Sequence, residues 1–416
     1  MSMLVIEGGN RLEGGVYVHG AKNAALPILA ATILGNGISV IRNCPDITDV
    51  DAALKILNYL GCKAFRNGDS VVVDTSCMSR CDIPEHMMRE MRSSVIFLGA
   101  ILARCGRADI TYPGGCELGP RPIDLHLKAF ERLSVKTDER HGRINCRTGR
   151  VKGCEISLDM PSVGATENIM LAAATAKGVT VIRNAAQEPE IVDLQGFLNC
   201  MGAKISGGGT NVITIEGTSG LSGCEYTVIP DRIEASTYMA AAAVTGGRLI
   251  INNVNPDHVQ SVISIMRTAG CDVALGQSKI EISAPARLKS VDYIRTMPYP
   301  GFPTDAQAII MAMLTVCDGV SVFSENIFSG RYKHVPPLIM MGANILTEGR
   351  TAIVRGVDRL YGANVKAEDL RGAAALVVAA LNAEGKSEIT GINYLDRGYC
   401  KLENSLSSVG ANIYRC

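Results

Sequence analysis

The chain has 416 residues, of which 47% are hydrophobic and 20% are charged, and its formal net charge is zero. Its length and composition predict two or three globular domains, each with a buried core. The balanced charge argues against nucleic acid or an anionic membrane as a partner, and no apolar run approaches the roughly 18 residues of a membrane span. The first residues lack a signal-peptide pattern, so we expect a cytoplasmic protein. The sequence does not define an oligomeric state.

Fourteen cysteines are scattered singly along the chain. None forms a CxxC pair and no cluster has metal-ligand spacing, so we expect no metal site. Most of them replace small apolar residues in periodic segments and are expected to be buried, reduced thiols. Examples are Cys62, Cys200, Cys271 and Cys317.

One pattern recurs six times along the chain. Related phrases such as LGCK, MGAK and VGAN return at intervals of about 68 to 73 residues, and a serine holds the matching position in a weaker second copy. The repeated positions are Gly61, Ser134, Gly202, Gly270, Gly342 and Gly410. Such regularity indicates a structural unit that was multiplied within the chain.

Each copy predicts the same order of elements. The first copy begins with an alanine-rich apolar helix at 22–34, followed by a β-branched strand at 38–43. An amphipathic helix at 49–61 and two short strands at 63–75 complete it. Because the first helix is apolar nearly all round, it should be buried.

The repeats also predict the domain organisation. Three copies could place their strands outside and their first helices inside, so that six copies form two similar domains. We expect domain I at 21–229 and domain II at 1–20 plus 230–416, because the extra strand at 1–8 has no copy of its own and should pair with the last one. The chain would then cross between domains near Gly20 and Pro230, which would make a natural hinge.

The starts of the predicted inner helices carry an unusual number of cations. Lys22 is followed by Asn23 in the first copy, and Arg92, Arg232 and Arg371 open later ones. A cation there opposes the helix dipole, but cations together with orphan backbone N–H groups form an anion-binding site. Simple solvation of these side chains at helix ends is the alternative interpretation.

An acidic residue stands at the corresponding place in the fifth copy. Asp305 lies in the stretch PYPGFPTDAQ, where three prolines and a glycine restrict the backbone. An acidic residue in a first turn is often only a partner of the helix dipole. Among neighbouring cations, however, Asp305 would stay ionised and could accept a proton from a hydroxyl group.

The segment YPGGCELGPRPIDLH at 112–126 departs most from the repeat. Its glycines would let the backbone approach a ligand, and its prolines limit its conformations. Cys116 lies five residues before Arg121, where a positive field would favour the thiolate, so we expect a chemical role and not that of a small buried side chain. His126 begins an amphipathic stretch and is interpreted as structural.

With these residues identified, the chain resembles the UDP-N-acetylglucosamine 1-carboxyvinyltransferases, which are enolpyruvyl transferases of peptidoglycan synthesis and targets of fosfomycin. The resemblance covers the whole chain and rests on long motifs, among them GAKNAALPILAATIL, PGGCELGPRPIDLH, PDRIEASTYMAAA and PYPGFPTDAQA. It implies an α/β fold with two inside-out α/β barrel domains and a site in the cleft between them. It also implies transfer of the enolpyruvyl group of phosphoenolpyruvate to the 3-hydroxyl of UDP-N-acetylglucosamine, with release of phosphate.

The resemblance implies roles for individual residues. Cys116 would be the acid that protonates the methylene carbon, and Asp305 the base that deprotonates the sugar hydroxyl. The residues implied for phosphoenolpyruvate are Lys22, Asn23, Arg121, Arg331, Arg371 and Arg397. Those implied for the nucleotide sugar are Arg92, Arg121, Pro122, Ile123, Asp124, Leu125, Ser162, Val163, Gly164, Asp305 and Ile327.

The implied chemistry agrees with these residue types. A trianionic donor requires converging arginine and lysine, and the addition–elimination needs one acid and one base but no cofactor. Two alternatives remain open at this point. A shikimate-pathway enolpyruvyl transferase would share the fold and the donor, and a catalytically silent paralogue would act as a regulatory or binding protein.

Overall fold

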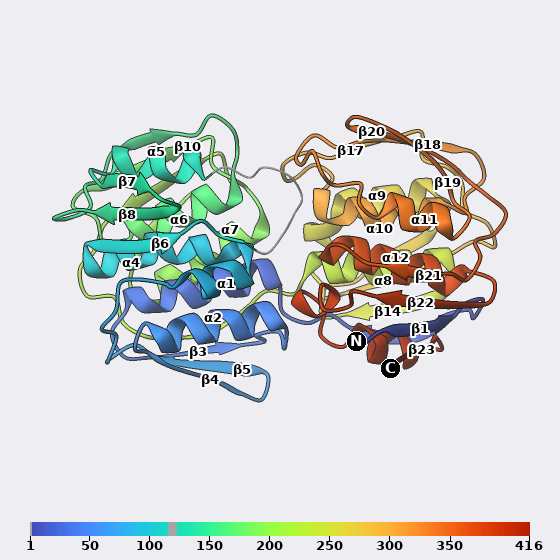
Figure 1. Ribbon diagram of the computed structural model, residues 1–416, viewed down its shortest axis with the longest axis horizontal. Coiled ribbons are helices and arrows are strands. Elements are labelled where there is room, and N and C mark those ends of the chain that lie inside the picture. Colours follow the sequence, from blue (N-terminus) through green and yellow to red (C-terminus); the bar gives the residue numbers. More distant parts are fainter. Residues whose placement is uncertain (1, 115–122) are drawn as a thin grey trace. The chain divides into compact units, whose positions relative to one another are not determined.

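The computed structural model describes residues 2–114 and 123–416, whose contacts group into two compact units. Unit I contains residues 20–114 and 123–229, and unit II contains residues 2–19 and 230–416. Both units are mixed α/β, as the sequence predicts, and each contains three sheets among its described residues (Figure 1). The predicted site residues Cys116, Arg121 and Pro122 lie outside the described part of the chain.

The first helix of each copy is an inner helix, as predicted. In unit II, every residue of α8 (Arg232–Val244) is buried, and α8 packs against α10 (Thr304–Leu314) and α12 (Leu370–Asn382). Figure 1 shows these three helices side by side with strands around them. The inner helices of unit I are α1 (Lys22–Ala31) with η1 (Thr32–Leu34), η2 (Arg92–Ile96) with α4 (Phe97–Cys105), and α6 (Val163–Ala173).

The third copy shows the predicted order of elements. β9 (Glu155–Ser157) and β10 (Val179–Arg183) flank α6 and pair in parallel. α7 (Pro189–Cys200) follows, and then β11 (Lys204–Ser206) and β12 (Val212–Glu216) add antiparallel strands to the same sheet. Each inner helix is therefore connected to a small sheet that covers it.

The other elements repeat this arrangement. Unit I also contains β3 (Ile38–Arg42), α2 (Thr48–Tyr59), β4 (Lys63–Asn67), β5 (Ser70–Asp74), α3 (Glu85–Glu90), β6 (Arg107–Thr111), α5 (Asp124–Arg132), β7 (Lys136–Arg140), β8 (Arg143–Arg147) and β13 (Glu225–Thr227). Unit II also contains β1 (Leu4–Glu7), β2 (Glu13–Tyr17), β14 (Arg248–Asn252), η3 (Pro256–Val259), α9 (Gln260–Thr268), β15 (Asp272–Leu275), β16 (Lys279–Ser283), β17 (Tyr293–Arg295), β18 (Val320–Ser324), α11 (Val335–Met340), β19 (Asn344–Glu348), β20 (Thr351–Arg355), β21 (Asn364–Lys366), β22 (Lys386–Thr390), η4 (Leu395–Arg397), α13 (Leu402–Ser407) and β23 (Asn412–Arg415).

The two ends of the chain share one sheet in unit II. Leu4 in β1 pairs with Ile389 in β22 on one side and with Arg415 in β23 on the other. The N-terminal strand thus completes the sheet of the last copy, which confirms the predicted pairing, and the termini lie near each other in Figure 1. β2 comes just before α1 in the chain but belongs to the sheet of β14 in unit II. β13 comes just before α8 but belongs to the sheet of β3 in unit I. At each passage between units, a strand therefore lies in one unit and the helix that follows it lies in the other.

The repeated glycines have a conformational reason. All five have a positive φ, from +95° at Gly342 to +105° at Gly202 and Gly410. Only glycine adopts such angles without a steric penalty, and these residues end the outer helices. Ser134, in the irregular second copy, has a φ of +66°, which an L-residue tolerates only at some cost.

Two other expectations can be compared with the described residues. Cys62, Cys271 and Cys317 are buried as predicted, but the prediction for Cys200 was wrong, because this residue ends α7 and is exposed. Within residues 2–114 and 123–416, no helix combines the length and apolar character that a membrane crossing requires.

Candidate active site

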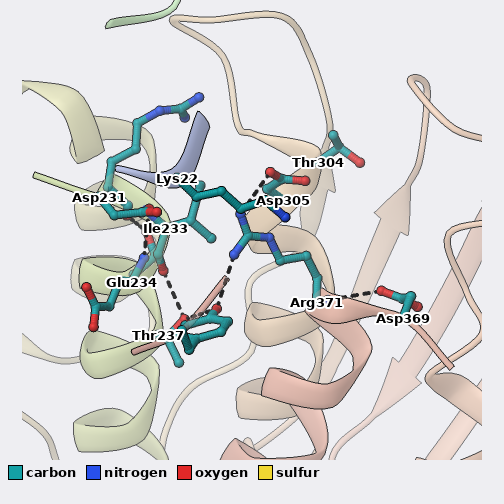
Figure 2. A network of polar contacts seen from close by, with 12 residues as sticks. Lys22, Asp231, Ile233, Glu234, Thr237, Thr304, Asp305, Asp369 and Arg371 are labelled. Carbon is teal, nitrogen blue, oxygen red and sulfur yellow. Dashed lines mark hydrogen bonds and ion pairs between the residues drawn. The ribbon is translucent and has the colours of Figure 1, made fainter. Parts of the chain in front are cut away.

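The inner helices of unit II begin close together, and two of the three are capped by an aspartate side chain. The Asp231 carboxylate accepts hydrogen bonds from the backbone N–H groups of Ile233 and Glu234 and caps α8. The Asp369 carboxylate caps α12 in the same way. α10 follows Pro303 and has no side-chain cap, so the second residue of this helix, Asp305, is available for other partners (Figure 2).

Asp305 lies between two arginines. Its Oδ1 is 2.6 Å from Nη2 of Arg331, and its Oδ2 is 3.1 Å from Nη2 of Arg371, which projects from the start of α12 in Figure 2. Only 3% and 4% of the two arginine side chains are exposed, against 27% of Asp305. Burial alone would raise the pKa of Asp305, but the charges of Arg371 and Arg331 outweigh it and hold the pKa well below its ordinary value. The carboxylate is therefore ionised.

Both arginines are held in place by further contacts. The Arg331 guanidinium donates to the backbone oxygen of Thr304 from Nε at 3.2 Å and from Nη2 at 3.1 Å. Arg371 donates from Nη1 to the hydroxyl of Tyr399 at 3.4 Å. These contacts orient the guanidinium groups toward the start of α10. A ligand carboxylate or phosphate could use the same geometry, because arginine forks match both groups.

A buried glutamate connects the next loop to this helix start. Glu325 accepts hydrogen bonds from the Thr304 hydroxyl at 2.9 Å and from the backbone N–H groups of Ile327 at 2.8 Å and Phe328 at 3.0 Å. Ile327, a predicted nucleotide-sugar residue, is thus tied to α10 and lies in the loop that leads to Arg331. The sequence did not point to Glu325, because acidic residues after a strand are common in loops.

Two further arginines that the sequence analysis singled out, Arg232 and Arg397, lie in unit II. Arg232 opens α8, is buried, and has its guanidinium carbon 5.8 Å from the centre of the Tyr299 ring. Arg397 ends η4, two residues before Tyr399, and is partly exposed. Since Tyr399 contacts Arg371, the structure brings the segment of Arg397 to the same helix starts.

In unit I, Lys22 has an acidic partner that the sequence did not identify. Lys22 opens α1, and its Nζ lies 2.8 Å from Oδ2 of Asp49 in the first turn of α2. Both side chains are almost fully buried. Asn23 follows on α1 and is partly exposed. Asp49 gave no signal because an acid in the first turn of a helix is structurally ordinary.

Of the residues predicted for the nucleotide sugar, Asp305 and Ile327 lie in unit II, whereas those described in unit I come together. Ser162 caps α6, and Gly164 packs against His126, whose Cε1 would lie 3.2 Å from a Cβ atom added at this glycine. His126 is in the first turn of α5 with Asp124 and Leu125, directly after Ile123. The starts of α5 and α6 are therefore neighbours, and Val163 lies at their junction.

His126 itself is structural, as interpreted from the sequence. It is buried, and its Nδ1 accepts a hydrogen bond from the amide nitrogen of Asn168 at 2.9 Å. Burial, together with the charge of Arg92, lowers its pKa to about 4, so the imidazole is neutral. Arg92 belongs to η2, which packs against α6, so this predicted ligand residue lies near the α5–α6 junction. Arg92 opens η2 and donates to the backbone oxygen of Pro113 at 3.4 Å.

Unit I also contains buried acids that the sequence did not assign. Glu167 in α6 is buried, and burial together with the charges of Glu190 and Glu188 raises its pKa well above the ordinary value. The motif AAQEPEIVDL holds two of these residues, and its paired acids before an apolar helix were the available signal. Among the described residues, no group of three or more histidine, cysteine or acidic side chains could hold a metal ion.

A cavity of about 500 Å³ lies elsewhere in unit I. It is lined by residues at the ends of the inner helices, such as Leu34, Leu102 and Thr175, and it includes none of the predicted site residues. The predicted residues lie at the starts of those helices. We therefore assign the candidate site from the charged side chains and not from this cavity.

Comparison with known proteins identifies the family of this chain. Residues 6–406 match the family model of EPSP synthase (3-phosphoshikimate 1-carboxyvinyltransferase). A UDP-N-acetylglucosamine 1-carboxyvinyltransferase 2 of Caldanaerobacter subterraneus subsp. tengcongensis is 53% identical over 415 residues, which cover 100% of both chains. A UDP-N-acetylglucosamine 1-carboxyvinyltransferase of Geobacter metallireducens is 45% identical over 100% of this chain and 99% of its own.

Solved structures have the same fold. The enolpyruvyl transferase NikO from Streptomyces tendae superposes with a TM-score of 0.90 at 25% identity, covering 100% of this chain and 98% of its own. An EPSP synthase from Acinetobacter baumannii has a TM-score of 0.77 at 18% identity and covers 100% of both chains, which supports the fold alone. The chain therefore belongs to the EPSP synthase family of enolpyruvyl transferases, in the group named UDP-N-acetylglucosamine 1-carboxyvinyltransferases.

Proposed function

We propose that this chain transfers the enolpyruvyl group of phosphoenolpyruvate to the 3-hydroxyl of UDP-N-acetylglucosamine and releases phosphate, the step that begins peptidoglycan synthesis in the cytoplasm. The observation that carries the proposal is the ionised Asp305 held by Arg331 and Arg371 at the starts of buried helices. Near full-length similarity to proteins named for this activity gives it a specific substrate pair.

The proposed reaction is an addition followed by an elimination. An acid protonates the methylene carbon of phosphoenolpyruvate, and the sugar hydroxyl, deprotonated by Asp305, attacks the adjacent cationic carbon. Phosphate then leaves as the methyl group of the tetrahedral intermediate loses a proton. We assign the acid to Cys116 on the basis of the family motif, and its thiolate in the empty enzyme would be the target of fosfomycin.

The ion pairs of Asp305 constrain its role as the base. A carboxylate that binds two guanidinium groups is a weak proton acceptor, because a base works best when its pKa lies near the working pH. We propose that the carboxylate of phosphoenolpyruvate takes over Arg331 and Arg371 as it binds. Asp305 would then lose charge stabilisation, and its pKa would rise when the sugar hydroxyl arrives. Donor binding would thereby activate the base.

The remaining predicted residues have supporting roles in this proposal. Lys22, Asn23, Arg121 and Arg397 would bind the phosphate of the donor, with charge-assisted contacts. In Lys22 the ammonium group already faces Asp49, so donor phosphate would compete with an existing ion pair. Arg92, residues 121–125 and 162–164, and Ile327 would bind the nucleotide sugar.

The test is phosphate release from phosphoenolpyruvate with each acceptor in turn. We expect rapid release with UDP-N-acetylglucosamine and none with shikimate 3-phosphate. Release with shikimate 3-phosphate alone would instead identify a shikimate-pathway enzyme. Absence of release with both acceptors, in a protein that still binds phosphoenolpyruvate by calorimetry, would identify a silent paralogue.

A further inference from the structure

Glu325 departs from the repeat at a position where three other copies have an asparagine. Asn43, Asn184 and Asn253 directly follow β3, β10 and β14, the corresponding strands of their copies. Their φ angles are +52°, +56° and +55°, which asparagine tolerates better than most residues. Each side-chain amide donates to the backbone oxygen that follows the parallel partner strand, at 2.7 to 2.9 Å. Glu325 follows β18 in the fifth copy, and a carboxylate has no N–H group with which to make this contact.

The next residue of the fifth copy performs this structural task. The side-chain amide of Asn326 donates to the backbone oxygen of Thr296, which follows the parallel partner strand β17, at 3.2 Å. Because Asn326 makes the contact that asparagine makes in the other three copies, the side chain of Glu325 serves contacts that are specific to this copy. The fifth copy is also the one that contains Asp305 and Arg331.

Glu325 connects three segments near the start of α10. It is only 1% exposed, and its Oε1 accepts from the Thr296 hydroxyl at 3.0 Å as well as from the backbone N–H groups of Ile327 and Phe328. Its Oε2 accepts from the Thr304 hydroxyl at 2.9 Å. Both oxygens therefore have partners, as the burial of a carboxylate requires.

These contacts lead to the ion pair between Asp305 and Arg331. Thr304 directly precedes Asp305 at the start of α10 (Figure 2), and its backbone oxygen accepts two hydrogen bonds from the Arg331 guanidinium. Glu325 thus holds the side chain of Thr304, whereas Arg331 holds its backbone. The two N–H donors to Glu325 lie in the loop that leads to Arg331. One carboxylate therefore fixes the segments that carry both members of the ion pair.

We propose that Glu325 is a positioning residue, which holds Asp305 and Arg331 in the relative orientation that enolpyruvyl transfer requires. The inference rests on the proposed function, because it assigns a role in that reaction. Glu325 acts through its neighbours, since its two oxygens are occupied by donors of the protein itself. Displacement of a reacting group by about 1 Å can reduce a rate about 100-fold, so a side chain of this kind can matter without contacting substrate.

Two substitutions of Glu325 separate placement from charge. Glu325→Asn introduces the residue that the same architecture uses in three other copies, but its side chain is one carbon shorter and falls short of Thr304. Glu325→Gln keeps the reach, because its amide can donate to the Thr304 hydroxyl oxygen while its carbonyl oxygen accepts from the loop. We expect kcat to fall about 10- to 100-fold in the asparagine variant, and glutamine to restore it to within a few-fold of wild type.

A double-mutant cycle tests the connection through Thr304. Thr304→Val removes the hydroxyl at nearly constant size, so kcat should fall in this variant, but it should fall no further when Thr304→Val is added to Glu325→Asn. The matched control is Thr315→Val at the other end of α10, where the hydroxyl donates to the backbone oxygen of Ala312 at 2.7 Å. This control should keep the kcat of the wild type.

The experiment measures kcat with the acceptor that the wild type uses, together with urea unfolding of every variant. Full kcat in a folded Glu325→Asn protein, equal losses with asparagine and glutamine, or additive losses in the double variant would each overturn the inference. If Glu325→Asn does not fold, Thr304→Val decides, since its kcat must fall while that of Thr315→Val does not. Lack of turnover by the wild type with either acceptor would overturn the proposed function as well, which distinguishes the two failures.

Discussion

Each unit holds a carboxylate near the start of an inner helix, and the charges around the two carboxylates are opposite in sign. In unit II, Asp305 near the start of α10 lies between Arg331 and Arg371, and its pKa is held low. In unit I, Glu167 near the start of α6 is buried and lies near other acids, and both effects raise its pKa. Both helices belong to the same repeated arrangement. The neighbouring side chains therefore decide whether an acid near the start of an inner helix is charged.

This difference has a consequence for function. An ionised acid among cations can accept a proton once its partners are drawn to a ligand, whereas a protonated acid among acids can only donate one. The comparison assigns the base of the proposed reaction to unit II. It also indicates that the acids of unit I act on stability and its pH dependence.

The largest expected effect is the loss of turnover when the proposed base in unit II is replaced. Asp305→Asn keeps the size of the side chain but removes the proton acceptor, so we expect turnover to fall by about two to four orders of magnitude. Circular dichroism should show an unchanged fold. Asp318→Asn, at an exposed position of the same unit, is the matched control and should keep full activity. Activity within a few-fold of wild type in the Asp305 variant would remove this residue from the base role.

The next effect concerns donor binding. Arg397→Ala should weaken phosphoenolpyruvate by about 1.5–3 kcal/mol, because a hydrogen bond to a charged group is lost, and should affect UDP-N-acetylglucosamine much less. Calorimetry is the appropriate measurement, because the chain contains no tryptophan. Arg359→Ala, which removes an exposed arginine paired with Glu384, is the control. Equal weakening of both ligands would indicate a general defect of the unit and not a phosphate contact.

The fold and the charged helix starts show how much of the structure the sequence could predict. The repeats predicted the inner helices, the pairing of the N-terminal strand with the last copy, and the cations at Lys22 and Arg371 in the first turns. Those features follow from periodicity and local pattern, which the sequence carries directly. Binding roles for these residues remain proposals.

The partners of these charges could not be predicted. Asp49 is an ordinary first-turn acid in the sequence, and the expectation for Asp305 named cations in general but no particular partners. Only the packing of separate segments shows that Asp49 faces Lys22 and that Asp305 faces Arg331 and Arg371. The ion pair of His19 with Glu234, whose Nδ1 and Oε1 atoms lie 2.9 Å apart, has the same character. These contacts depend on tertiary distance, for which a single sequence contains no signal.

The third prediction tests the sign of the electrostatic difference through pH. A glutamate in the unfolded chain has a pKa of about 4.3. Because Glu167 has a raised pKa in the folded protein, it retains its proton above that pH while the unfolded chain loses it, so its contribution to stability falls as pH rises until the folded pKa is passed. Asp305 behaves oppositely, since its stabilising contribution is present above about pH 3.9 and is lost only as the pH falls through its lowered folded pKa.

Glu167→Gln should therefore flatten the decline of stability toward high pH. The amide cannot ionise, so we expect it to stabilise the protein by about 1 kcal/mol or more at pH 8, the equivalent of a pKa unit, and to have little effect at pH 4. Urea unfolding at several pH values measures this. Glu216→Gln, at an exposed position of the same unit, should leave the profile unchanged. A variant less stable than wild type at every pH would contradict the assignment.

The smallest expected effect concerns the backbone of the irregular copy in unit I. Ser134 has a φ of +66°, where an L-residue is less favourable than glycine by about 1–2 kcal/mol, but glycine also gives the unfolded chain more freedom. Ser134→Gly should therefore stabilise the protein by only about 0.5 kcal/mol in urea unfolding. Gly202→Ser is the reciprocal control, since its φ is +105° and an added Cβ would meet only Leu221 Cδ2, at 4.0 Å. This variant should be destabilised by about 1 kcal/mol or more through the backbone alone. If both substitutions destabilise the protein, the serine makes a contribution specific to the second copy, and that copy departs from the repeat for a reason other than tolerated strain.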